Sequence, residues 1–321
     1  MLSNKWNSPV LSGLLRACLA RDRAAARKEF AAEHGEIPGG RIALVALGAL
    51  GRREFATGGP VQLLFLYDHD PIPAGVPGLS PQDWHARLLQ RFMRLVGDLS
   101  PEGILFEARP VYPLPGSGSA CTMTALREHF DNGASVAELR MLAHARVIDA
   151  EGDLGDSFEA FRESVLSHPH DRSGVAGGIS IARTGEAEKH RAGDTWDVLH
   201  GPGGLADIEL VAEYLQLTGA GTVTRGLVPV FESAAGQGQI DAHIADDFSR
   251  AASLWQNLDG FFRMAGADSF DPRLAPPDQK ATIAEACEVE SFDVLPGMIA
   301  DIAGRAAAHI DALLAGAAET A

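Results

Sequence analysis

Apolar positions recur at helical spacing along most of the chain. Leu11, Leu15 and Leu19 share one face of a segment that begins at Ser8-Pro9 and ends before Gly35. A serine N-cap, a proline in the first turn and a glycine after the last turn are typical of a helix. A second capped helix is predicted after Ser80-Pro81. Further helices are predicted over 122–130, 135–148, 155–167, 207–218, 239–264, 281–288 and 294–315.

Three short apolar runs lack helical period and are predicted to be strands. They cover 42–47, 61–67 and 104–108, and the first two are nearly continuous, as in strands buried on both faces. We expect a short mixed sheet within 41–112, with 61–67 as a central strand beside 42–47. Pro60 must then be the first residue of its strand or lie on an edge, because proline donates no ladder hydrogen bond.

The change from a mixed to a helical pattern predicts an α+β organisation. A small α/β domain with an N-terminal helix is expected over 1–130, followed by an all-helical bundle domain over 131–321. The segment 167–193, rich in Gly, Ser and His, is expected to be an irregular connection.

Composition narrows the class of protein. Of the 321 residues, 46% are hydrophobic and 22% charged, values typical of a globular chain, and the net charge is −16. Such an acidic balance argues against nucleic acid or an anionic membrane as partner. There is no secretory-signal pattern, no apolar run of bilayer length, and the three cysteines lack metal-ligand spacing. A cytoplasmic location is expected.

Two segments, in the same order, carry a family resemblance. The first is Gly-Ala-Leu-Gly-Arg-Arg-Glu (48–54), which links the first two predicted strands. The second is Gly-Pro-Gly-Gly-Leu-Ala-Asp-Ile-Glu (201–209), which leads into an amphipathic helix. Together they resemble glutamine synthetase adenylyltransferase, the enzyme that adenylylates and deadenylylates glutamine synthetase. Ala145-Arg146-Val147 fits the helix that the family places between them, and the resemblance covers roughly residues 40–265. The family enzyme has two nucleotidyltransferase units, whereas this chain has room for one.

The resemblance implies a nucleotidyltransferase-like fold with two metal ions on a cluster of carboxylates. In this fold an Asp-x-Asp pair on the second strand and a third Asp on a neighbouring strand hold the ions, which clamp the attacking and leaving oxygens. The matching positions here are Pro60, Gln62 and Arg109. A basic residue that the family has before the glycine loop is Leu199. The metal site is therefore expected to be degenerate, with no metal or cofactor bound.

Acids at other positions offer a weaker alternative. Asp68-His69-Asp70 follows the second strand but lies eight residues beyond the expected pair, in what reads as a turn. Glu107 lies on the third strand and could hold one cation, or could simply pair with Arg109. If these acids rebuilt the site, Mg²⁺ and ATP would be its cofactors.

Glycines and arginines of the two matched segments are candidates for binding a nucleotide phosphate, through backbone N–H groups and guanidinium charge. They are Gly48, Gly51, Arg52, Arg53, Gly58, Gly59, Arg109, Gly203, Gly204 and Asp207. The alternative is structural: the glycines allow turns, Arg53 and Glu54 form an ion pair, and Asp207 caps a helix that begins at Ile208.

Other polar residues gave weaker signals. His168, His170, His190 and His200 gather in the glycine-rich connection, but no helix or hairpin is predicted there to fix them as metal ligands. Ser117 and Ser119 lie among glycines and are interpreted as turn residues, not nucleophiles.

Three functions remain open from the sequence. The leading one is a catalytically impaired relative of the adenylyltransferase that binds a nucleotide or a protein partner and regulates nitrogen metabolism. Glutamine synthetase and a nitrogen-signalling protein are the candidate partners. The others are an active adenylyltransferase with a rebuilt acidic site, which would transfer AMP from ATP to a tyrosine of glutamine synthetase, and an interaction module that binds no nucleotide.

Overall fold

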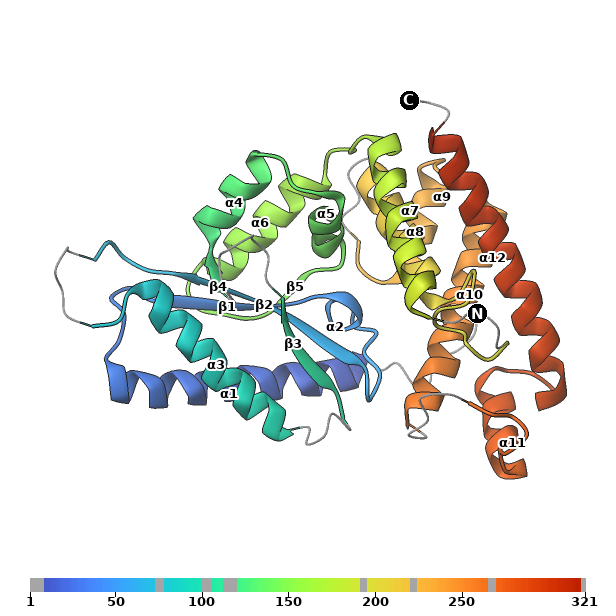
Figure 1. Ribbon diagram of the computed structural model, residues 1–321, viewed down its shortest axis with the longest axis horizontal. Coiled ribbons are helices and arrows are strands. Elements are labelled where there is room, and N and C mark those ends of the chain that lie inside the picture. Colours follow the sequence, from blue (N-terminus) through green and yellow to red (C-terminus); the bar gives the residue numbers. More distant parts are fainter. Residues whose placement is uncertain are drawn as a thin grey trace. The chain divides into compact units, whose positions relative to one another are not determined.

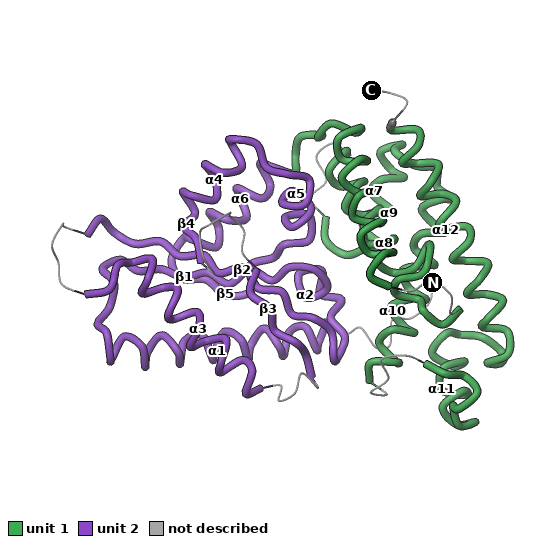
Figure 2. Tube along the Cα trace, in the orientation of Figure 1, with its two compact units in different colours: residues 1–8, 166–321 green, residues 9–165 purple. Residues whose placement is uncertain are grey.

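The chain forms two compact units, shown in different colours in Figure 2. We call residues 9–165 the sheet unit and residues 166–321 the helical unit. The computed structural model describes residues 9–72, 78–99, 105–111, 120–190, 195–219, 224–264 and 270–318. Ser8, Ser117 and Ser119 lie outside these ranges. The boundary between the two units follows residue 165, whereas the sequence predicted it at 130. The difference arises because a fifth strand and the helix after it still belong to the sheet unit.

A five-stranded mixed sheet forms the centre of the sheet unit. Its strands are β1 (Arg41–Ala46), β2 (Pro60–Asp68), β3 (Glu107–Val111), β4 (Ala120–Thr122) and β5 (Arg146–Ala150). The order is β3-β2-β1-β5, and β4 also pairs with β2. β1 is antiparallel to β2 and β5, whereas β2 is parallel to β3 and β4. The expected mixed sheet is confirmed, and so is Pro60 as the first residue of a central strand.

Helices cover both faces of this sheet (Figure 1). The long helices α1 (Pro9–His34) and α3 (Pro81–Leu99) pack on one face, over alternate residues of β2 such as Val61, Leu63 and Phe65. The opposite face, with Leu64 and Leu66, is covered by α4 (Met123–Asp131), α5 (Val136–Ala143) and α6 (Leu154–Leu166). Successive side chains of β2 point to opposite faces of the sheet and thus contribute to two separate hydrophobic cores. A short helix, α2 (Gly48–Arg52), follows β1.

Two predictions in the sheet unit were wrong in detail. The helix predicted over 135–148 ends at Ala143, and the next residues form β5, so Arg146 lies on a strand and not on a helix. Pairing of β5 with β1 supplies the backbone hydrogen bonds that helix continuation would have supplied. The third strand runs over Glu107–Val111, later than the expected 104–108, and the three-residue β4 was not predicted.

A buried charge network joins α1 to the sheet edge. Arg23 donates hydrogen bonds to Asp149 and Glu151, and Arg27 also pairs with Glu151. Glu151 further accepts a hydrogen bond from the backbone N–H of Ile42 at 3.1 Å. Each buried charge therefore has a partner, the condition under which such charges are tolerated in a protein interior.

The helical unit consists of packed helices, as expected. They are α7 (Arg172–Lys189), α8 (Leu205–Thr218), α9 (Leu227–Gly236), α10 (Ala242–Met264), α11 (Pro277–Ala286) and α12 (Leu295–Ala318), with a short 3₁₀ turn at Phe292–Val294. None of the described helices is long and apolar enough to cross a membrane.

Two of these helices differ from the sequence prediction. α7 occupies the segment expected to be irregular: Asp171 caps it by accepting a hydrogen bond from the N–H of Gly174, and Val175 and Ile179 bury its inner face. Burial and capping outweigh the low helix propensity of its glycines. α9 was not predicted at all.

The buried His85 predicts a dependence of stability on pH. Its ring stacks on Tyr67 with the centroids 4.1 Å apart, its Nδ1–H donates to the Pro81 carbonyl at 2.7 Å, and its Nε2 is buried without a partner. Burial lowers the pKa of His85 to about 4. The unfolded chain, with a pKa near 6.5 at this position, therefore binds the proton first as the pH falls.

We expect stability to be fully present above about pH 6.5 and to fall by up to about 3 kcal/mol on acidification to pH 4. Urea unfolding at several pH values measures this dependence. In His85→Phe the free energy of unfolding should decrease less on acidification than in the native chain. His34→Ala, at the exposed end of α1, is the control and should behave like the native chain. Part of the dependence of stability on pH should remain in this variant, because the pKa of the buried His144 is also lowered. An unchanged pH profile in His85→Phe would contradict the assignment.

Candidate functional site

Strand register brings the three positions of the expected metal site onto one surface. In the parallel pairing of β2 and β3, Gln62 lies opposite Arg109 and Pro60 lies opposite Glu107. All four side chains are exposed, at the end of the sheet where β2 and β3 begin. Pro60 and Gln62 continue the face that carries Leu64 and Leu66, beyond the part that helices cover. We call these four residues the strand-end patch.

An ion pair dominates the strand-end patch. The Arg109 guanidinium donates two hydrogen bonds to the Glu107 carboxylate, from Nε to Oε1 at 2.8 Å and from Nη2 to Oε2 at 2.6 Å. Each side chain is 58% exposed, so the pair is solvated. The guanidinium lowers the pKa of Glu107, and the carboxylate raises the pKa of Arg109. Both oxygens of the remaining acid are thus already engaged by a cation.

The turn into α2 borders this patch. Gly48 has a φ of +54°, a conformation that side chains rarely adopt, and a methyl group there would lie 3.4 Å from the Gln62 Oε1 atom. Gly51 packs so closely that a methyl group would overlap the carbonyl oxygen of His144 and approach that of Ala46 to 2.8 Å. The glycine at position 51 is thus explained by the close approach of two backbone segments.

A buried arginine, which the sequence analysis assigned to a helix and to no site, holds this turn. Arg146 donates from Nε to the Gly51 carbonyl at 3.0 Å and from Nη2 to the Leu50 carbonyl at 2.8 Å. Both carbonyls lie in the last turn of α2, and that of Leu50 also accepts from the Arg53 N–H at 3.2 Å. In the sequence, Ala145-Arg146-Val147 matched a segment of the family, but it was assigned to a predicted helix, and nothing in the sequence indicated its contact with α2.

The two candidate arginines of this turn have different environments. Arg52 is buried and forms an ion pair with Glu54, Nε to Oε2, at 2.7 Å. The expected pair between Arg53 and Glu54 is therefore wrong by one residue. Arg53 is exposed, with a left-handed φ of +66° that ends α2. A ligand at the surface could reach Arg53 more readily than Arg52.

Backbone N–H groups of the candidate glycines are largely used within the fold. Gly58 donates to the Leu105 carbonyl at 2.6 Å and Gly59 to the Ala56 carbonyl at 3.1 Å. The N–H of Gly51 donates to the Leu47 carbonyl at 3.2 Å. These hydrogen bonds shape the loop between α2 and β2, and a phosphate would have to compete with them.

Asp68 and Asp70 lie at the other end of β2. Asp68 ends that strand, opposite Arg41, and its carboxylate accepts a hydrogen bond from Arg41 at 3.0 Å. Eight residues of extended chain separate it from Pro60, or about 26 Å. Neither acid can therefore share an ion with Glu107 while this strand is intact.

The second matched segment lies in the helical unit. The Asp207 carboxylate accepts two hydrogen bonds from Arg183, at 2.9 and 2.8 Å, and one from the Gly203 N–H at 2.9 Å. Gly204 is the N-cap of α8, so the expectation that Asp207 caps a helix beginning at Ile208 was wrong. Asp207 instead lies in the first turn and joins α8 to α7. Leu199 is partly buried, and its carbonyl accepts from the Ala206 N–H at 3.0 Å.

Gly203 is fixed by its neighbours. It has a φ of +72°, its carbonyl accepts a hydrogen bond from the Trp255 indole at 3.0 Å, and a methyl group there would overlap the backbone of Ala303.

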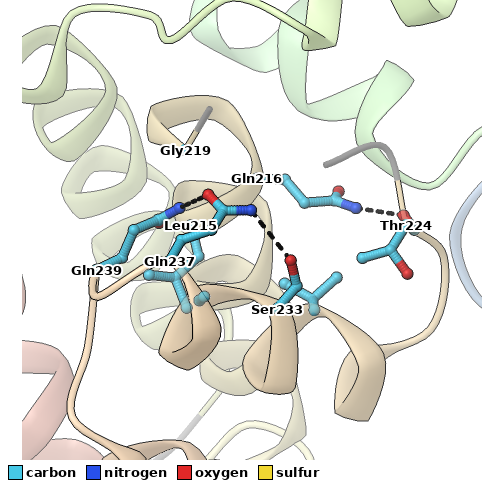
Figure 3. A pocket seen from close by; sticks show the side chains of 9 residues that line it. Leu215, Gln216, Gly219, Thr224, Ser233, Gln237 and Gln239 are labelled. Carbon is cyan, nitrogen blue, oxygen red and sulfur yellow. Dashed lines mark hydrogen bonds between the residues drawn. The ribbon is translucent and has the colours of Figure 1, made fainter. Parts of the chain in front are cut away.

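A small polar pocket lies in the helical unit, beside α8 and α9 (Figure 3). Gln237 links two of its side chains: it accepts from Gln239 at 2.9 Å and donates to the Ser233 hydroxyl at 3.1 Å. The Oε1 atoms of Gln216 and Gln239 are buried without a donor. The lining has no acid, base or thiol, so the pocket offers hydrogen bonds but no group for acid–base catalysis. It is lined by Leu215, Gln216, Gly219, Thr224, Val230, Ser233, Ala234, Gln237 and Gln239.

Comparison with known proteins identifies the family. The family model for glutamate-ammonia ligase adenylyltransferase matches residues 6–161, which include the whole sheet. Proteins named bifunctional glutamine synthetase adenylyltransferase/adenylyl-removing enzyme match about 90% of the chain. The one from Xanthobacter autotrophicus is 31% identical over 300 residues, and that from Mesorhizobium japonicum is 30% identical over 294. The chain belongs to the glutamine synthetase adenylyltransferase family.

The match is partial in one respect. The chain spans about 30% of the length of the curated relatives that it matches. It therefore corresponds to one part of a glutamine synthetase adenylyltransferase, in agreement with the single nucleotidyltransferase unit expected from the sequence. Its sheet unit has the α+β fold that the resemblance implied.

The close packing at Gly51 predicts a specific sensitivity to substitution. Gly51→Ala should destabilise the chain by about 3 kcal/mol, because backbone atoms of His144 and Ala46 would have to move. Gly13→Ala is the matched control: it lies within α1 with no atom within 4 Å of the added methyl group, and should be neutral or stabilise by about 0.5–1 kcal/mol. Urea unfolding measures both. Equal stability of the two variants would show that Gly51 is not held by this contact.

Proposed function

We propose that this protein is a catalytically impaired member of the glutamine synthetase adenylyltransferase family that acts by binding a partner in the regulation of nitrogen metabolism. Its partner would be glutamine synthetase itself or a nitrogen-signalling protein. The observation that carries the proposal is the composition of the strand-end patch. At the three positions where the family's fold places metal-binding acids, this chain has Pro60, Gln62 and Arg109.

Charge and ligand chemistry support this. Proline has no ligand atom, and the glutamine oxygen is neutral, whereas Mg²⁺ is held in proteins chiefly by carboxylates and phosphates. Arg109 adds a permanent positive charge. A second cation at this position would be repelled by that charge. The remaining acid, Glu107, is paired with Arg109.

The geometry disfavours a rebuilt acidic site. Such a site would need Glu107 together with Asp68 or Asp70, yet Glu107 lies opposite Pro60 and Asp68 opposite Arg41, at the two ends of β2. In-line transfer of a nucleotidyl group depends on charge neutralisation at a single point.

Direct binding of ATP is the second candidate, and the exposure of Arg109 favours it. Guanidinium pairs well with phosphate without a metal, so Arg109 could exchange Glu107 for a triphosphate. Arg53, which ends α2 a few residues before β2 begins, could contribute a second positive charge. Binding of this kind is independent of metal and weakened by salt.

A calorimetric titration separates these functions. We expect no Mg²⁺-dependent ATP binding and no transfer of labelled AMP to glutamine synthetase, with the Xanthobacter autotrophicus relative as the positive control. Co-sedimentation should detect binding of glutamine synthetase or of a nitrogen-signalling protein. Heats of ATP binding that persist with EDTA would favour the second candidate. Transfer of AMP would overturn the proposal, and absence of any binding would leave an interaction module for other partners.

Restoring the acids tests the same argument from the other side. The triple variant Pro60→Asp, Gln62→Asp, Arg109→Asp should bind Mg²⁺ at least about tenfold more tightly than the native chain, a difference of about 1.4 kcal/mol. Arg109→Gln is the matched control, since it removes the cation without adding a ligand and should gain much less. Equal Mg²⁺ affinity in all three proteins would contradict a metal site at these positions.

A further inference from the structure

Three potential metal ligands meet at the end of α7. Glu186 and His190 lie one helical turn apart, and His200 lies in the turn before α8. One ligand atom from each lies within 4.8 Å of the other two. Within the described ranges this is the single place where three such side chains gather. It belongs to the helical unit, whereas the strand-end patch belongs to the sheet unit.

Local structure explains why the three converge. The spacing of four residues puts Glu186 and His190 on one face of α7, with the Glu186 Oε2 atom 3.8 Å from the His190 Nε2 atom. Asp197 shapes the turn that carries His200, because its carboxylate accepts from the His200 N–H at 2.9 Å and its carbonyl accepts from the Gly201 N–H at 3.2 Å. The site is thus formed by two ordered elements.

The imidazole rings of His190 and His200 lie face to face. Their rings stack with the centroids 3.4 Å apart and an angle of 1° between the planes. Two cationic rings at this distance would repel. The His200 Nδ1 atom is buried and has no hydrogen-bond partner. A buried nitrogen of this kind carries a desolvation cost that a metal ion or a donor would remove.

We propose that Glu186, His190 and His200 bind a divalent transition metal of the zinc type. Two imidazole nitrogens and one carboxylate oxygen suit Zn²⁺ and its neighbours, and do not suit Mg²⁺ or Ca²⁺, which take oxygen ligands. Three protein ligands leave a fourth position for water. Ligand atoms about 2.1 Å from the ion are about 3.4 Å apart in a tetrahedron, so the ligand atoms, which lie within 4.8 Å of one another, must approach by at most about 1.4 Å.

Binding requires a small rearrangement of side chains. The lone pair of an imidazole nitrogen lies in the ring plane, so one ring must turn about its Cβ–Cγ bond to leave the stack. His190 is the C-cap residue of α7 and its side chain is 39% exposed, so we expect this ring to be the one that turns. Lys189 occupies only the Oε1 atom of Glu186, at 2.7 Å, and is itself 66% exposed, so it competes weakly.

The bound ion would link the C-terminal end of α7 to the turn that precedes Gly201–Gly204. Since Asp207 already joins α8 to the middle of α7 through Arg183, the metal would add a second tie between the same two helices. The site therefore has a structural role in the helical unit, and its existence does not depend on the proposed function.

Titration of the whole chain, without a histidine tag, with ZnCl₂ tests the site. We expect one ion per chain, no comparable heat with MgCl₂, and a rise in the melting temperature with Zn²⁺. His190→Ala and His200→Ala should each weaken binding by about 100-fold or more, since loss even of groups behind a ligand costs 10–100-fold. His168→Ala, an exposed histidine of the same unit, is the matched control and should bind normally.

A second readout keeps the result independent of folding. Co²⁺ in a site of low coordination number absorbs strongly in the visible range, and this band should appear in the native chain and in His168→Ala and be absent in His190→Ala. Circular dichroism of each variant without metal checks that it folds. Absence of stoichiometric Zn²⁺ binding by the native chain, or its full retention in the double variant His190→Ala, His200→Ala, would overturn the proposal.

Discussion

The contact between α2 and β5 is the constraint on which the rest of the sheet unit depends. Arg146 donates to the two carbonyls that end α2, while Gly51 lets the same turn lie directly against the backbone of His144. A side chain at position 51 or a shorter one at 146 would separate the two segments. With them held together, β1 leads into a turn of fixed direction, and β2 returns beside it with Pro60 and Gln62 at the surface.

Buried cations gather behind that turn, and the fold supports them by directed hydrogen bonds. Arg162 donates to the carbonyls of Leu142 and Ala143 at the end of α5, as Arg146 does at the end of α2, and Arg52 is paired with Glu54. Helix C-termini carry partial negative charge, so these arginines complement them. Burial, and then the charges of Arg52 and Arg162, lower the pKa of His144 and keep it neutral. This end of the sheet is therefore organised around arginine and not around acids.

The sequence was most informative where a residue type has one physical consequence. Continuous apolar runs predicted β1 and β2, and the missing N–H of Pro60 predicted its place at a strand start. It was least informative where tertiary contacts decide. The sequence around Arg146 continues a helical pattern, but pairing with β1 makes it a strand residue. The glycines of α7 suggested a loop, whereas the cap at Asp171 and the burial of Val175 stabilise a helix. The meeting of His190 with His200 was hidden for the same reason. The metal and nucleotide roles of the candidate residues stay predictions.

The side chains of the strand-end patch are exposed in the described part of the chain, so they can change at little cost in stability. Gly51 and Arg146 are held by buried contacts, whereas Pro60, Gln62 and Arg109 are exposed, so their replacement costs little stability. Three carboxylates on neighbouring strand positions would repel one another unless a cation lay between them. If the metal site is lost as proposed, the repulsion between these carboxylates is absent. Arg109 and Glu107 then attract each other at the same place. The fold and the surface chemistry are thus energetically separable. The buried turn stabilises the family's fold, and the exposed residues that the turn supports determine what the fold can bind.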